Sequence, residues 1–181
     1  MAGSLRRLGW MACALFLGCV PLANWMIGHV GTVCVPAGPC LVPVAPGLLA
    51  PSGVLTVGAS LVLRDIVQRC LGLGAGLLAI LAGTALSMLV APPSLVIASG
   101  SAFLLSELAD FAVYTPLQRR RLVLAVILSS AVGLVVDSIV FLGLAFGSLA
   151  FLPGQVVGKA WAVLASIPFV RLLRRVAPTP A

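Results

Sequence analysis

The sequence predicts an all-α membrane protein, a polytopic bundle of six transmembrane helices with both termini in the cytoplasm. Of its 181 residues, 61% are hydrophobic and only 8% are charged, whereas a soluble domain of this length carries about 25% charged residues. Six apolar segments approach the roughly 20 residues that a helix needs to cross a bilayer. The basic residues fall in alternate connections between these segments. Together these observations exclude a water-soluble fold.

The six segments are expected to form a single transmembrane domain over residues 1–181. Each is an apolar run bounded by polar, proline or glycine residues. The predicted spans cover about 8–23, 52–68, 71–90, 95–114, 122–146 and 153–173.

Arginine and lysine predict the orientation. The connections at about 24–51, 91–94 and 147–152 contain neither residue type. Basic residues are enriched in cytoplasmic loops, so the other connections and both termini are expected on the cytoplasmic side. The same rule explains the net charge of +7 without a nucleic-acid partner. The basic positions at these ends are Arg6, Arg7, Arg64, Arg69, Arg119, Arg120, Arg121, Arg171, Arg174 and Arg175.

A cleaved signal peptide is the alternative for the first span, because that span also has a basic start and an apolar run. Leu17-Gly18-Cys19 weakly resembles a lipoprotein cleavage site. Retention of the span is favoured, because Asn24 and Trp25 are typical of the interfacial end of a transmembrane helix.

The segment 24–51 is rich in proline and glycine, apolar and uncharged. Irregular backbone at membrane depth is tolerated only where protein or a cavity covers it. An external loop lying on the bundle and a short re-entrant segment both fit this composition. Cys34 and Cys40 share the segment, so a disulfide between them is compatible with its external placement. The odd total of five cysteines, without other metal ligands, favours packing as small apolar side chains.

Polar side chains recur at helical spacing within four of the predicted spans. A charge at mid-membrane costs at least about 2.5–3.5 kcal/mol, so charged side chains usually face the bundle interior and find partners there. Gly and Ser pack helices together at lower cost, which makes a binding site for a polar solute the favoured explanation. The candidate substrate-binding residues are Asn24, Arg64, Gln68, Glu107, Asp110, Asp137, Ser138, Gln155 and Lys159.

The positions of these residues along their spans predict which of them meet. At about 1.5 Å of rise per residue, Asp137 and Lys159 lie at similar depth and are expected to pair. Arg64, Glu107 and Asp110 lie deeper toward the cytoplasmic side and are expected to form a second cluster.

Asp65 and Arg69 lie four residues apart in the second span and are expected to pair along their own helix. A purely structural role for all these charges, as pairs that join helices, is the alternative to a solute site. No metal site, cofactor site or nucleophile–base arrangement is apparent in the sequence, so no enzyme activity is expected.

Four segments resemble, in order, the signature motifs of the vitamin uptake transporter family, also called queuosine precursor transporters. They are PSG at 51–53 with LRDIVQ at 63–68, SELADFAVY at 106–114, GLVVDS at 133–138 and GQVVGK at 154–159.

This resemblance implies a multi-pass inner-membrane importer of a deazapurine precursor of queuosine, such as 7-cyano-7-deazaguanine. The first alternative is a substrate-binding subunit of an ATP-driven vitamin uptake complex, which would need a separate ATPase module. A second is an intramembrane enzyme that uses Glu107 and Asp110 as an acid–base pair. The expected partners are a small-molecule substrate and the lipid bilayer, with homo-oligomerisation left open.

Overall fold

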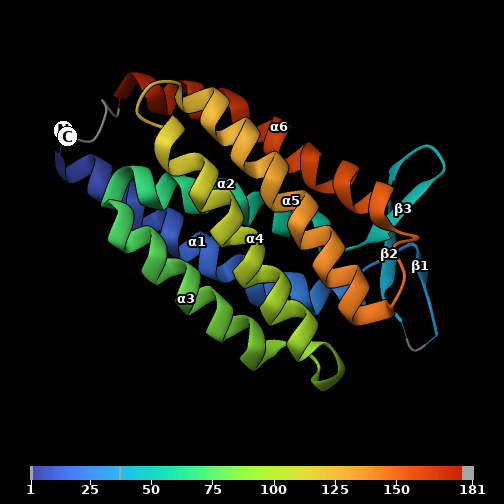
Figure 1. Cartoon of the computed structure of the whole chain (residues 1–181). Helices are drawn as coiled ribbons and strands as arrows, with labels where there is room; N and C mark the ends of the chain where they lie inside the picture. The colour runs from blue at the N-terminus through green and yellow to red at the C-terminus, as the bar shows by residue number, and fades with distance from the viewer. Residues whose placement is uncertain (1, 37, 177–181) are drawn as a thin grey trace.

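The computed structural model describes residues 2–36 and 38–176, and the side chains of 3–36 and 38–174. Six long helices form a bundle, and a small antiparallel sheet lies at one end of it (Figure 1). The elements are α1 Ala2–His29, β1 Val33–Cys34, β2 Cys40–Ala45, β3 Leu48–Pro51, α2 Val54–Leu71, α3 Leu73–Val90, the 3₁₀ turn η1 Pro93–Leu95, α4 Val96–Leu117, α5 Leu122–Phe146 and α6 Leu152–Val176.

Helix α2 is the centre of the bundle. It packs against α1, α3, α4, α5 and α6. Within the described residues, five helices are long and apolar enough to cross a membrane, and α2 is not among them. Its composition differs because it carries Arg64, Asp65 and Arg69, all of which are buried. The helical bundle is confirmed; six membrane crossings and their orientation remain predictions.

The helix ends that carry the arginines gather at one end of the bundle. Figure 1 shows the start of α1, the connection between α2 and α3, the turn between α4 and α5, and the end of α6 together there. Direct contacts support this arrangement, since Arg69 Nη1 donates to the Gln118 carbonyl oxygen (3.2 Å). The sheet and the α5–α6 connection lie at the opposite end. This charge asymmetry is the one that the positive-inside pattern requires.

Residues 24–51 differ from the sequence prediction. Helix α1 continues to His29, so Asn24 and Trp25 lie within it rather than at its end. The residues after it form a three-stranded antiparallel sheet in the order β1-β2-β3, where the sequence predicted irregular backbone. The physical reason lies in the valines of the run at 40–45, because β-branched residues favour strands; this run pairs with 48–51. Between them Gly47 adopts φ +73°, which glycine permits without strain.

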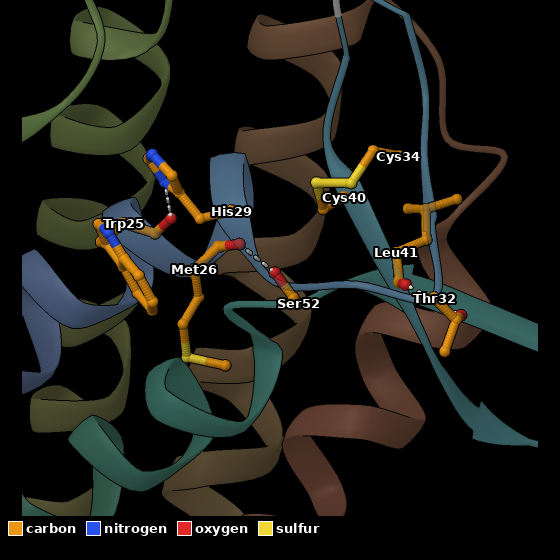
Figure 2. Close-up of a disulfide and its surroundings, with 8 residues drawn as sticks. All are labelled: Trp25, Met26, His29, Thr32, Cys34, Cys40, Leu41 and Ser52. Carbon is orange, nitrogen blue, oxygen red and sulfur yellow. Dashed lines mark hydrogen bonds between the residues drawn. A yellow bond between two sulfur atoms is a disulfide. The ribbon is translucent and has the colours of Figure 1, made fainter.

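A disulfide joins Cys34 to Cys40, directly across the β1–β2 pair (Figure 2). The favoured interpretation of these two cysteines as unpaired small side chains was therefore wrong, and the alternative is correct. Cys13, Cys19 and Cys70 are free thiols.

The sheet is attached to α1 and α6. Ser52 Oγ, just after β3, donates to the Met26 carbonyl oxygen of α1 (2.6 Å; Figure 2). The indole Nε1 of Trp161 donates to the Val44 carbonyl oxygen of β2 (2.9 Å). These bonds hold the sheet over the end of the bundle at which α2 begins.

Helices α2 and α6 approach each other closely at Gly58. A Cβ atom at this position would lie 2.5 Å from the Lys159 carbonyl oxygen and 2.9 Å from its Cα. Both are backbone atoms, so they can yield only if the helices separate. The absence of a side chain at Gly58 therefore brings α2 against the part of α6 that carries Lys159.

We expect Gly58→Ala to lower the midpoint of thermal unfolding in detergent, because overpacking costs about 1–3 kcal/mol. Gly143→Ala is the matched control: Gly143 also lies within a helix, but a Cβ atom added there would meet no neighbouring atom within 4 Å. An unfolding midpoint for Gly58→Ala equal to that of the control would contradict the close approach of α2 and α6.

The Cys34–Cys40 disulfide also offers a test of orientation. In a variant whose other three cysteines are replaced by alanine, a membrane-impermeant maleimide should label intact spheroplasts only after reduction. Labelling that requires permeabilised membranes would place the sheet in the cytoplasm, and labelling without reduction would show that the disulfide is absent.

Candidate functional site

Arg64 is the centre of a buried cluster of charges between α2 and α4. Its guanidinium Nε donates to Glu107 Oε2 (3.2 Å), and Nη1 donates to Gln68 Oε1 (2.8 Å). Nη2 forms ion pairs with Asp110 and, at 2.9 Å, with Asp65. All three carboxylates and Arg64 itself are at most 1% exposed. The sequence prediction that Arg64, Glu107 and Asp110 meet is confirmed.

The Asp65 contacts differ from those expected. An ion pair with Arg69 along the same helix was predicted, whereas the structure pairs Asp65 with Arg64 and directs it toward α5. There Ser129 Oγ donates to Asp65 Oδ2 (3.4 Å). Asp65 therefore belongs to the interior of the bundle and not to its cytoplasmic edge.

Aromatic rings and a glycine close the cluster. The Arg64 guanidinium lies over the rings of Phe111 and Tyr114, at 5.6 and 5.5 Å from their centroids, a separation at which cation–π attraction acts. Gly133 of α5 faces Asp110: a Cβ there would lie 3.1 Å from Asp110 Cβ. The cluster is packed on all these sides by protein.

Lys159 is the centre of a second buried cluster, between α5 and α6. Its ammonium donates to Asp137 Oδ2 (2.5 Å), to Ser138 Oγ (2.8 Å) and to Gln155 Oε1. The Ser138 hydroxyl in turn donates to the Leu134 carbonyl oxygen (2.6 Å). The predicted pairing of Asp137 with Lys159 is confirmed, and their formal charges cancel.

The Lys159 cluster opens into a pocket on the sheet side of the bundle. Small-molecule sites are mostly apolar with a few placed polar groups, and this lining has that composition. Phe103 and Phe141 contribute rings to its lining. Each of the helices α1 to α6 contributes to its polar lining. The polar lining residues are Asn24, Ser60, Ser87, Ser99, Asp137, Gln155 and Lys159.

The predicted site residues divide between the pocket and the Arg64 cluster. Four of them line the pocket: Asn24, Asp137, Gln155 and Lys159. Ser138 accepts a hydrogen bond from Lys159. The Asn24 amide nitrogen donates one of its two hydrogens to the Val20 carbonyl oxygen (3.0 Å), so its second N–H and its carbonyl group are left for a ligand. The remaining predicted residues belong to the Arg64 cluster and do not line the pocket; they are Arg64, Gln68, Glu107 and Asp110.

Sequence reasoning left out several lining residues. Ser60, Ser99, Phe103 and Phe141 fall on the polar faces noted in the sequence, so their periodicity was a usable signal. Ser87 lies on α3, a helix in which no site residue was predicted. Cys19, Pro51 and Gly53 also line the pocket, and only the tertiary structure brings them there.

Ser60 contacts both the pocket and the Arg64 cluster. Its side chain lines the pocket, and its Oγ lies 3.4 Å from Glu107 Oε1 in the Arg64 cluster. A single side chain, that of Ser60, therefore separates the pocket from the buried carboxylates.

Comparison with known proteins agrees with these features. The family model described as "Putative vitamin uptake transporter" matches residues 87–180, which is more than half of the chain. This region contains the Glu107, Asp110, Asp137 and Lys159 positions. Searches of curated proteins and of solved structures returned no match. Because this family model matches more than half of the chain, we conclude that the chain is a multi-pass membrane protein that belongs to the vitamin uptake transporter family.

Proposed function

We propose that the pocket at Lys159 binds a small, neutral, planar polar solute, and that the protein imports it across the cytoplasmic membrane. A deazapurine precursor of queuosine, such as 7-cyano-7-deazaguanine, is the proposed substrate. The observation that carries this proposal is the Lys159–Asp137–Gln155 group opening into the pocket.

The charge at the pocket favours a neutral solute. Lys159 and Asp137 cancel one another, and all three ammonium hydrogens of Lys159 already have acceptors. A solute carbonyl or nitrile group can replace the Gln155 oxygen on Lys159 without leaving a charge unpaired. An anion or cation would upset this balance, which is costly in a site of low dielectric constant.

The polar groups and rings suit a heteroaromatic ring. A guanine-like edge has both donors and acceptors, which amide and hydroxyl side chains can match because they bond in both directions. Gln155, Asn24, Ser60 and Ser99 supply such groups around the pocket. The mostly apolar remainder of the lining, with its phenylalanine rings, suits the faces of the ring.

The direct test is queuosine formation in a host that lacks its own precursor synthesis and uptake. Expression of this chain with supplied 7-cyano-7-deazaguanine should restore queuosine in tRNA, without an added ATPase module. No restoration despite membrane expression would rule out this substrate. Restoration only together with an ATPase module would assign the chain the role of a capture subunit.

Lys159→Gln should reduce this uptake by roughly tenfold or more, because a hydrogen bond to a charged group contributes about 1.5–3 kcal/mol. The double variant Lys159→Gln with Asp137→Asn removes the pair without leaving a lone charge, which separates a binding defect from misfolding. Arg171→Gln is the control: it removes an exposed cation from the same helix and should leave uptake unchanged. Wild-type uptake in the well-expressed double variant would contradict the proposed site.

A further inference from the structure

The Arg64 cluster contains more negative than positive charge. Three carboxyl groups, those of Asp65, Glu107 and Asp110, surround Arg64, and Arg69 is the other buried cation of α2. If every carboxyl group were ionised, one negative charge would remain even with both arginines counted. An uncompensated charge in an apolar interior is strongly unfavourable, and such groups usually become neutral instead.

One buried oxygen atom in this cluster, Asp110 Oδ2, has no hydrogen-bond donor. Asp65 Oδ1 is held only by its ion pair with Arg64 Nη2 (2.9 Å), without hydrogen-bond geometry. The two carboxyl groups contact the same nitrogen atom, Arg64 Nη2, and so lie next to each other. Two carboxylates cannot bond directly, whereas a carboxylic acid can donate to a carboxylate. One proton on this pair would therefore provide the missing donor and remove the excess charge.

We propose that Asp65 and Asp110 share one exchangeable proton, so that the Arg64 cluster is a proton-binding site. Closely interacting carboxyl groups titrate as a coupled pair and can hold a single proton between them. Glu107 Oε2 already accepts a hydrogen bond from Arg64 Nε, so the proton is assigned to the aspartates. The site does not depend on which solute the pocket carries.

The surroundings favour a proton over a metal cation. Arg64 Nη2 already lies between the Asp65 and Asp110 oxygens and would repel a second cation there. Within the described residues, no three acidic, histidine or cysteine side chains are arranged to hold a metal ion. Helix α3 brings no titratable group toward the pair. The charged and titratable groups near it from the other helices are Arg64, Arg69, Glu107, Tyr114, Asp137, Lys159 and Cys19.

This site has a route by which it can affect transport. The Glu107 carboxylate lies between Arg64 and Ser60, and Ser60 lines the pocket. Protonation of the aspartate pair changes the charge that Arg64 must balance, and so changes the strength of the ion pair between Arg64 and Glu107. Through Glu107 and Ser60, the protonation state that a proton gradient sets is connected to the pocket.

Infrared spectroscopy of the purified protein tests the proposal without a solute. A protonated carboxyl group has a carbonyl stretch above the amide band, and the stretch moves to lower frequency after exchange into D₂O. We expect such a band at neutral pH. Its absence, or its failure to move after prolonged exchange, would overturn the proposal.

Isotope labelling assigns the band without altering the fold. Carbon-13 at the side-chain carboxyl of aspartate should shift the band, whereas the same label in glutamate, of which Glu107 is the only example, should not. A shift with labelled glutamate would place the proton on Glu107 and contradict the shared pair.

Two variants then locate the proton among the aspartates. Asp110→Asn and Asp65→Asn each leave the cluster balanced without a proton, so each should lose the band. Asp137→Asn, in the Lys159 cluster, should retain it. Loss of the band in Asp137→Asn alone would overturn the assignment.

Discussion

Arg64 and Lys159 are almost completely buried within a bundle whose outer surface is apolar. Neither cation can remain in such an environment without nearby anions, because desolvation costs more than the helix packing around it returns. The four acidic residues of the chain supply those anions. Since Arg64 lies on α2 and its partners Glu107 and Asp110 on α4, the requirement also fixes which faces of these helices turn inward.

The two cations meet the same requirement in different surroundings. Around Arg64 the partners, two aromatic rings and Gly133 fill the space, and the cluster is closed. Around Lys159 the charges balance one to one, and the group opens into the pocket. A balanced pair that faces a cavity can exchange a neutral partner for a solute, whereas the unbalanced, enclosed cluster is suited to holding a proton. Ser60 contacts both of them.

The sequence was sufficient to predict the helical bundle and both principal ion pairs. Helical rise placed Asp137 and Lys159 at similar depth, and it placed Arg64, Glu107 and Asp110 together nearer the cytoplasmic side. The rotation of each helix about its axis is not encoded in such patterns, so the boundary between pocket and closed cluster could not be predicted. The Asp65–Arg64 pair was missed for a related reason: adjacent residues on a helix do not normally face each other, yet both turn toward α4 and α5.

Residues 24–51 show another limit. Their prolines and glycines indicated irregular backbone, while the pairing of Cys34 with Cys40 and of β2 with β3 depends on register between segments, which composition does not reveal. The sheet matters to the site, because Pro51 and Gly53 at its end line the pocket.

The central claim is that the Lys159 pocket, and not the Arg64 cluster, holds the solute. Equilibrium dialysis of the purified protein against a panel of labelled deazapurines, purines and vitamins tests it most directly. We expect 7-cyano-7-deazaguanine to be retained, and we expect Gln155→Ala to weaken its binding while Gln68→Ala, at the Arg64 cluster, does not. Retention of no panel member, or a loss caused by Gln68→Ala and not by Gln155→Ala, would contradict it.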